Sequence, residues 1–283
     1  MKIVVTGANG QLGSELRDIL QNREEFDPFF LDRKQLPLDH PAIIQDILAM
    51  YEPDVILHCA AYTAVDKAET ESELADKINH LASEEIAQYC RLNGTKLIAI
   101  STDYVFDGNS HQALSEDAPV DPINVYGLTK MKGEQAIQKW CPEGIIIRTS
   151  WVYSTYGNNF VKTMIRLMKE RDEIAVINDQ IGSPTYAKDL AEALIHILLQ
   201  QKWVPGIYHY SNEGEISWYD FAVAIRDVQN LKCSIKPIST SQYPTPAKRP
   251  KYSLLDKTKI KETFGVEVPS WKDSLEKMLM ALR

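Results

Sequence analysis

The chain has 283 residues, of which 44% are hydrophobic and 25% are charged, an ordinary composition for a globular protein with a large core. Its formal net charge of −8 argues against a general nucleic-acid binder and against a protein that binds anionic membrane surfaces. The sequence has no apolar run as long as a membrane span and no signal peptide, and its four cysteines are scattered, so we expect a cytoplasmic protein with reduced thiols.

The first stretch of the chain predicts a strand, a glycine-rich turn and a helix. The run Ile3-Val4-Val5 is typical of a buried parallel strand, and apolar residues then recur with helical spacing over 12–20. Gly7, Gly10 and Gly13 lie between these two segments. This strand–turn–helix context is the one that a dinucleotide-binding fingerprint requires.

Each of the three glycines has a defined task in such a site. Gly7 would permit the tight turn, Gly10 would let the backbone approach a pyrophosphate, and Gly13 would let the helix pack close to the strand. The free N–H groups at the start of the helix would then face the phosphates. The spacing is G-x-x-G-x-x-G rather than G-x-G-x-x-G, and a plain tight βα turn is the alternative.

The next apolar run, Phe29-Phe30-Leu31, ends at Asp32, which Arg33 follows at once. An acidic residue about 20 residues after the glycine turn binds the ribose hydroxyls of NAD, whereas an arginine at this corner can hold the 2′-phosphate of NADP. The sequence therefore leaves NADH and NADPH open, with a solvated Asp-Arg turn as the alternative. Asp39 lies in a later loop that could border the adenine.

Residues 54–58 predict a third strand, which ends in the small residues Cys59-Ala60-Ala61. Small residues at this end of a strand let a cofactor lie close to the backbone, and this edge of an open α/β sheet is where ligands bind. We interpret His58, inside the strand, as a core histidine rather than a catalytic one.

A fourth strand over 96–100 leads into Ser101-Thr102-Asp103, and a following helix carries Tyr126 and Lys130 on one face. A nearby Lys130 ammonium would favour the phenolate and lower the pKa of Tyr126, ordinarily about 10. Tyr126 could then give a proton to a carbonyl oxygen as a hydride reaches the carbon. Thr102 could hydrogen-bond the same oxygen.

The alternation of strands and helices continues through a fifth strand over 143–147 and implies a parallel sheet covered on both faces. The predicted fold class is α/β, with a Rossmann-type doubly wound sheet. After about residue 170 the rhythm changes, although further elements are expected: a helix over 187–199, a strand over 207–210, and helices from Trp218 and Trp271. We predict an NAD(P)-binding domain over 1–170, to which later segments return, and a smaller α/β substrate-binding region over 171–283.

These motifs occur together in the extended short-chain dehydrogenase/reductases, which the chain resembles. The resemblance includes the glycine triplet, Thr102 and the Tyr126-x-x-x-Lys130 pair, and covers almost the whole chain. Further matching stretches are residues 6–13, 60–69, 101–106, 124–127, 148–153, 178–185 and 243–250.

The resemblance implies an enzyme in which NADPH or NADH reduces the C4 ketone of dTDP-4-dehydro-L-rhamnose to dTDP-L-rhamnose, a precursor of bacterial surface polysaccharide. It implies a dTDP-sugar substrate and leaves a homodimer open, with or without Mg²⁺ between the subunits. We expect no catalytic metal, because hydride transfer to a ketone can use the tyrosine as its acid.

The resemblance also implies residue roles. Tyr126 resembles the proton donor, Lys130 its partner and ribose ligand, and Thr102 the group that tunes the tyrosine. The implied cofactor-binding residues, beside Tyr126 and Lys130, are Gly7, Gly10, Gln11, Leu12, Gly13, Asp32, Arg33, Asp39, His40, Ala60, Ala61, Tyr62 and Thr63. The implied substrate-binding residues are Thr102, Asp103, Tyr126, Trp151, Asn159 and Arg249, with core packing as the alternative for Trp151 and a solvated loop charge as the alternative for Arg249.

Two other functions stay open. A nucleotide-sugar epimerase or 4,6-dehydratase would keep its NAD bound, but the dehydratases need an acidic pair after the threonine, and Thr102 is followed by Asp103-Tyr104. A non-catalytic NADP-binding subunit, similar to the regulatory β subunit of methionine adenosyltransferase, would act by binding a partner. A turnover assay separates these classes.

Overall fold

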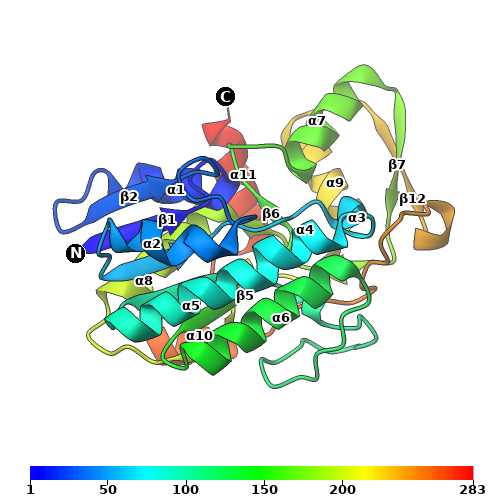
Figure 1. Cartoon of the computed structure of the whole chain (residues 1–283). Helices are drawn as coiled ribbons and strands as arrows, with labels where there is room; N and C mark the ends of the chain where they lie inside the picture. The colour runs from blue at the N-terminus through cyan, green and yellow to red at the C-terminus, as the bar shows by residue number, and fades with distance from the viewer. Residues whose placement is uncertain (283) are drawn as a thin grey trace.

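The computed structural model describes residues 1–282 and is built on a six-stranded parallel sheet (Figure 1). The strand order is β10-β5-β4-β3-β1-β2, so the first strand lies inside the sheet and the chain proceeds outward from it in both directions. The strands are β1 (Lys2–Thr6), β2 (Asp27–Leu31), β3 (Val55–His58), β4 (Lys96–Thr102), β5 (Ile145–Thr149) and β10 (Gly206–His209).

Helices cover both faces of this sheet, which confirms the predicted doubly wound α/β fold. One face packs against α1 (Gln11–Leu20), α8 (Ala187–Leu199) and α10 (Thr258–Phe264). The other packs against α2 (Ile44–Ala49), α5 (Ala82–Asn93) and α6 (Val125–Trp140), and α5 and α6 lie side by side in Figure 1. Because the inner strands β1, β3 and β5 are buried on both faces, they are largely continuous apolar runs rather than alternating ones.

The strand–turn–helix at the start of the chain needs its glycines for steric reasons. Gly7 has a φ of +72°, and a Cβ there would lie 2.8 Å from Ala60 Cα. A Cβ on Gly13 would clash with the Gly7 carbonyl oxygen. The helix α1 therefore begins in contact with the turn, and β1 approaches the end of β3 closely.

A second, smaller core lies beside the sheet. It is formed by the parallel pair β7 (Glu173–Ile177) and β12 (Ser234–Ile238) with α7 (Phe160–Glu170), α9 (Trp218–Val228) and α11 (Trp271–Ala281). In Figure 1, α7, α9, β7 and β12 stand out from the sheet at the upper right, and we call these four elements the projecting lobe. The chain passes from the sheet to this lobe and back, because α8, β10 and α10 all follow residue 170.

Short elements complete the chain between these larger ones. The two-residue strands are β6 (Val152–Tyr153), β8 (Ile181–Gly182), β9 (Thr185–Tyr186) and β11 (Ile216–Ser217). The single-turn 3₁₀ segments are η1 (Pro41–Ile43), η3 (Asp103–Val105) and η4 (Thr240–Gln242). Among the helices in residues 1–282, none combines the length and apolar character needed to cross a membrane.

Residues 65–93, which connect β3 to β4, do not form one continuous helix. The chain forms α3 (Val65–Ala68), α4 (Ser72–Asp76), a π-helical turn η2 (Lys77–Leu81) and then α5. The π turn contains Asn79, whose side chain bonds the backbone of Tyr62 and the Thr129 hydroxyl on α6. Such π turns are rare and are frequently found at functional sites, and this one bonds Tyr62, which lines the cavity described below.

We predict that Gly13→Ala lowers the free energy of unfolding by about 1–3 kcal/mol, because the added methyl group has no room beside the Gly7 carbonyl. Chemical denaturation measures the change. Ser14→Ala, in the same turn of α1, is the matched control and should stay close to wild type. Equal stability of the two variants would show that the close approach of α1 to the turn is not required.

Candidate active site

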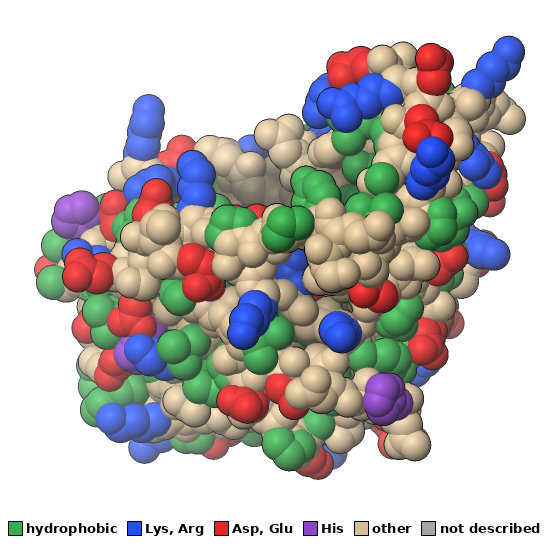
Figure 2. All heavy atoms as spheres, turned by 90° about the vertical axis from the view of Figure 1, so that its right-hand side faces the viewer, with side chains coloured by type: hydrophobic (Ala, Val, Ile, Leu, Met, Phe, Trp, Pro, Cys, Tyr) green, Lys and Arg blue, Asp and Glu red, His purple; other side chains and the backbone are tan. Residues whose placement is uncertain are grey.

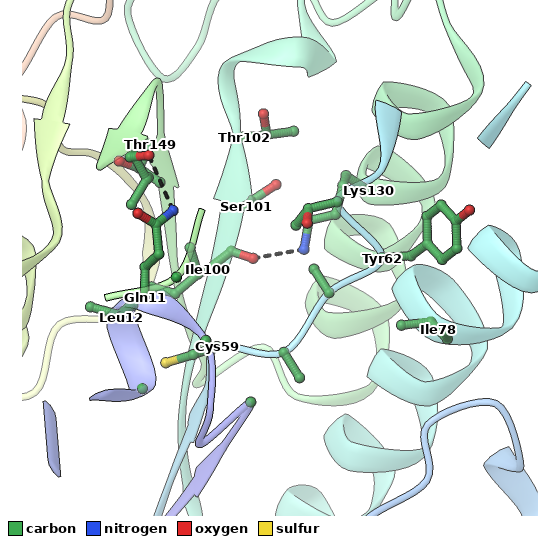
Figure 3. Close-up of a pocket in the computed structure, with 18 of the residues that line it drawn as sticks. Gln11, Leu12, Cys59, Tyr62, Ile78, Ile100, Ser101, Thr102, Lys130 and Thr149 are labelled. Carbon is green, nitrogen blue, oxygen red and sulfur yellow. Dashed lines mark hydrogen bonds between the residues drawn. The ribbon is translucent and has the colours of Figure 1, made fainter. Parts of the chain in front are cut away.

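A cavity of about 880 Å³ lies at the carboxyl edge of the sheet, next to the projecting lobe. The surface in Figure 2 is hollowed beside this lobe, and Figure 3 shows the residues inside. Its walls come from the ends of β1, β3, β4 and β5 and from the start of α9. This is the edge at which open α/β sheets bind ligands, and the volume suits a cofactor with a substrate.

Most of the residues singled out in the sequence line this one cavity. Those that do are Gly7, Gly10, Gln11, Leu12, Gly13, Asp32, Arg33, Asp39, Ala60, Ala61, Tyr62, Thr63, Thr102, Asp103, Tyr126, Lys130 and Trp151. His40, Asn159 and Arg249 do not line it.

One end of the cavity begins at the N-terminus of α1, where Gly10 is the N-cap and brings no side chain to the free N–H groups. Asp32 stands at the end of β2, and backbone hydrogen bonds from Lys34 and Gln35 hold the pKa of its carboxyl below the usual range. Arg33 pairs with Asp39 at 3.1 Å. The Arg33 side chain is 76% exposed, so the pair contributes little to stability and the guanidinium is free to meet a phosphate instead.

The wall after β3 is held by buried hydrogen bonds. Thr6 Oγ1 accepts from the Ala60 N–H at 3.1 Å and lies 2.8 Å from His58 Nδ1. Asn79 Oδ1 accepts from the Tyr62 N–H at 2.8 Å. Burial lowers the pKa of His58 to about 3, so the ring is neutral, and the interpretation of His58 as a core histidine is confirmed.

Tyr126 and Lys130 face β4 from the first turns of α6. The N-cap Asn124 accepts from the Gly127 N–H at 2.7 Å, which starts the helix just before Tyr126. Lys130 Nζ donates to the Ile100 carbonyl at 2.7 Å, the contact marked in Figure 3, and both Lys130 and Thr102 are buried.

The expected lowering of the Tyr126 pKa by Lys130 is wrong in direction. Burial raises the pKa of Tyr126 to about 12, and a hydrogen bond with Thr102 opposes this only in part. Burial also lowers the pKa of Lys130 to about 8. The cost of burying a phenolate therefore dominates, and the phenol keeps its proton at neutral pH.

Asp103 follows Thr102 directly and is buried. The Thr102 hydroxyl donates to Asp103 Oδ1 at 3.0 Å, and burial raises the pKa of the Asp103 carboxyl to about 6. Tyr104, the next residue, packs edge-on against Tyr126 with ring centroids 5.6 Å apart. The end of β4 thus places a hydroxyl, a carboxyl and an aromatic ring around the Tyr126 phenol.

Another wall of the cavity is aromatic, and the sequence predicts a site role for only one of its two rings. Trp151 stacks on Trp218 with ring centroids 3.7 Å apart, and both rings line the cavity. Trp151 has a φ of +48°, and its ring lies 3.1 Å from the position of a Cβ on Gly182. The sequence predicts a helix that begins at Trp218 but gives this residue no site role, because no local signal links it to Trp151.

The three residues outside the cavity have other contacts. Both Arg249 Nη atoms bond Asp66, at 2.7 and 3.0 Å. Asn159 caps α7 and donates to Gln11 Oε1 at 3.0 Å. His40 is exposed and lies 3.3 Å from Asp39. Asn159 therefore contacts Gln11, which lines the cavity, without lining it itself. Arg249 would have to leave Asp66 to reach a ligand.

Comparison with known proteins agrees with this geometry. The RmlD substrate binding domain family matches residues 1–283. The chain belongs to this family. A dTDP-4-dehydrorhamnose reductase of Aggregatibacter actinomycetemcomitans is 39% identical over 286 residues, 97% of each chain. The crystal structure of a dTDP-4-dehydrorhamnose reductase of Clostridium acetobutylicum superposes with a TM-score of 0.96 at 39% identity, over 100% of this chain and 99% of that one.

A further solved relative bears on the cofactor. The dTDP-4-dehydrorhamnose reductase of Bacillus anthracis, in complex with NADP, is 42% identical, covers 99% of each chain and has a TM-score of 0.95. These matches confirm the resemblance drawn from the sequence, the enzyme class of NAD(P)H-dependent oxidoreductase and the cofactor class.

We predict that Arg33→Ala raises the Kd for NADPH about tenfold, or about 1.4 kcal/mol, because the guanidinium lines the cavity beside Asp32 and can meet a 2′-phosphate. The Kd for NADH should change less than about twofold. Fluorescence titration of both cofactors measures this, and an equal loss of affinity for NADH and NADPH would contradict the assignment.

Proposed function

We propose that this protein uses NADPH or NADH to reduce the C4 ketone of dTDP-4-dehydro-L-rhamnose, which yields dTDP-L-rhamnose. The observation that carries the proposal is a single cavity that joins a glycine cradle to the Tyr126, Lys130 and Thr102 side chains. The relatives that match nearly the whole chain are named for this reaction.

The chain's residues fit a dinucleotide on steric and electrostatic grounds. A Cβ at Gly7 or Gly13 would clash with the backbone of Ala60 or of Gly7, so glycine at both positions permits the tight turn into α1, where free N–H groups can meet a pyrophosphate. Asp32 is an acceptor for ribose hydroxyls, and Lys130 is a buried donor for a second ribose. A bound reduced nicotinamide would supply the hydride.

Tyr126 is the proposed proton donor to the carbonyl oxygen. A general acid must hold its proton before the reaction and lie within hydrogen-bond reach of the acceptor. The raised pKa of Tyr126 satisfies the first condition at neutral pH. The Thr102 hydroxyl bonds this phenol and orients it. The role proposed for Lys130, four residues along α6, is to stabilise the phenolate that forms.

Trp151 and Trp218 are proposed to contact the sugar. A 6-deoxy sugar carries a methyl group where a common hexose carries a hydroxyl, so an aromatic face suits it. Asp103 would accept a sugar hydroxyl, since its buried carboxyl adjoins Thr102. Arg249 stays a candidate for the diphosphate, which would replace Asp66 as its partner.

Asn159 and His40 are weaker candidates. Asn159 would act through Gln11, and His40 would act only at the exposed rim, next to Asp39. The 4,6-dehydratase alternative is disfavoured because Tyr104 occupies the position of the second acid, and burial raises the pKa of its phenol above the ordinary value. The regulatory-subunit alternative predicts NADPH binding without turnover.

We predict that wild-type protein oxidises NADPH in the presence of the dTDP-keto sugar and that Tyr126→Phe loses about 10²–10⁴ in kcat, because the variant removes the acid. The Kd for NADPH should stay unchanged. Stopped-flow absorbance gives the rate and fluorescence gives the Kd. Full turnover by Tyr126→Phe would remove Tyr126 from the mechanism, and no turnover by wild-type protein would favour a binding module.

We predict that Trp151→Ala raises the KM for the dTDP-keto sugar about tenfold and leaves the Kd for NADPH unchanged, because the ring offers a sugar-facing wall. Phe160→Ala is the matched control. Phe160 packs on Trp218 with centroids 4.6 Å apart but does not line the cavity, so this variant should lose stability and keep its KM. A Trp151→Ala variant with a lowered Tm and an unchanged sugar KM would place Trp151 in the core alone.

A further inference from the structure

A third ionisable residue lies on the same face of α6 as the two catalytic candidates. Tyr126, Lys130 and Glu134 are spaced four residues apart and so follow one another along the helix. The Glu134 carboxylate is buried, with a relative exposure of 4%. A buried carboxylate is costly unless it is paired, so its partners show what it is placed to do.

Glu134 joins three elements of the site through its two oxygens. Arg148 on β5 donates to it twice, with Nε 2.9 Å from Oε1 and Nη2 2.7 Å from Oε2. Ser101 on β4 donates from Oγ to Oε1 at 2.5 Å. Ser101 precedes Thr102 and follows Ile100, the residue that accepts the Lys130 hydrogen bond.

The carboxylate also acts on Lys130 electrostatically. Burial disfavours the Lys130 ammonium, and the groups that favour it are Glu134 and, to a smaller degree, the thiol of Cys59 at the end of β3. Burial raises the pKa of Cys59 to about 12, so that thiol is neutral. The neighbouring His58 is neutral as well.

The remaining groups around Lys130 do not replace this charge. Tyr126, one turn away on α6, keeps its proton at neutral pH. Thr102 and Ser101 on β4 contribute hydroxyls, the Asp103 carboxyl is bonded to Thr102, and Arg148 is a cation that pairs with Glu134. The Glu134 carboxylate is therefore the negative charge that compensates the Lys130 ammonium from within α6.

We propose that Glu134 is a positioning residue for the reaction. It keeps Lys130 charged and held against β4, and it keeps Thr102 aligned with Tyr126. The inference rests on the proposed function and deepens it. Loss of the charge should neutralise Lys130 within the working pH range, which weakens its hold on the nicotinamide ribose and its stabilisation of the Tyr126 phenolate. The kcat should then begin to fall at a lower alkaline pH than in wild type.

The test is the pH profile of kcat from pH 6 to 10. In Glu134→Gln the alkaline limb should move down by about one pH unit, with kcat at pH 8.5 about tenfold lower than in wild type. The sign follows from the charge, because the active form holds a proton on Lys130 and losing a nearby anion lowers the pKa at which that proton leaves. Glu134→Asp keeps the charge and should keep the limb near its wild-type position.

A double variant separates positioning from stability. Glu134→Met with Arg148→Met replaces the buried ion pair by apolar side chains of similar size, a change that often preserves stability. We expect a Tm close to that of wild type together with the lowered alkaline limb. If Glu134→Gln alone does not fold, the double variant replaces it in the test, because the double variant leaves neither Glu134 nor Arg148 as an unpaired charge.

Asp189→Asn is the matched control. Asp189 is another buried carboxylate and accepts a hydrogen bond from Asn212 Nδ2 at 2.7 Å. It lies on α8, which packs on the opposite face of the sheet from α6. This control should lose stability and keep the wild-type pH profile. A double variant with the wild-type limb and kcat would overturn the inference, as would an equal shift in the control.

Cofactor binding distinguishes failure of the inference from failure of the proposed function. The Kd for NADPH, followed by fluorescence from pH 6.5 to 9.5, reports the Lys130 charge without the sugar. If wild-type protein binds NADPH but does not reduce the sugar, the proposed function fails, and Glu134→Gln should still weaken NADPH binding at the alkaline end. An unchanged pH dependence of that Kd would overturn the role of Glu134.

Discussion

A buried ammonium at the carboxyl edge of the sheet is the constraint on which the rest of the site depends. Lys130 lies in a place where water cannot solvate it fully. The Ile100 carbonyl accepts its hydrogen bond, and the Glu134 carboxylate favours its charge electrostatically. Because Glu134 is itself bonded to Ser101 and Arg148, the charge fixes α6 against β4 and β5. A shift in any of these elements would leave a charge unpaired at substantial cost.

The walls of the cavity at this edge come from both cores of the protein. The sheet supplies the glycine cradle and the Tyr126 side of the cavity, while Trp218 comes from α9 in the projecting lobe. Trp151, two residues after the buried end of β5, stacks on Trp218. The ligand-binding edge therefore exists because the chain leaves the sheet after β5 and later returns as β10, so that the lobe is held beside the strand ends.

The sequence predicts those parts of the site whose signals are local. The run from β1 through α1, the Asp32 corner and the Tyr126–Lys130 pair each lie within one turn or one helix, and each reaches the cavity. Trp218 and the Asp66 partner of Arg249 depend on contacts between residues far apart in the chain, which spacing does not reveal. The predicted direction of the Tyr126 pKa failed for a similar reason. The charge of a neighbour four residues away is visible in the sequence, whereas the burial that outweighs it arises only from packing.

The central claim, hydride transfer to a sugar C4 carbonyl beside Tyr126, can be tested by following the hydride itself. The wild-type protein would be given the dTDP-keto sugar and NADPH deuterated at the transferable position of the nicotinamide C4, and the product sugar would be analysed by NMR. We expect one deuterium on the sugar C4 for each NADP formed. Deuterium at another carbon, or bound NADPH that is never oxidised, would contradict the account.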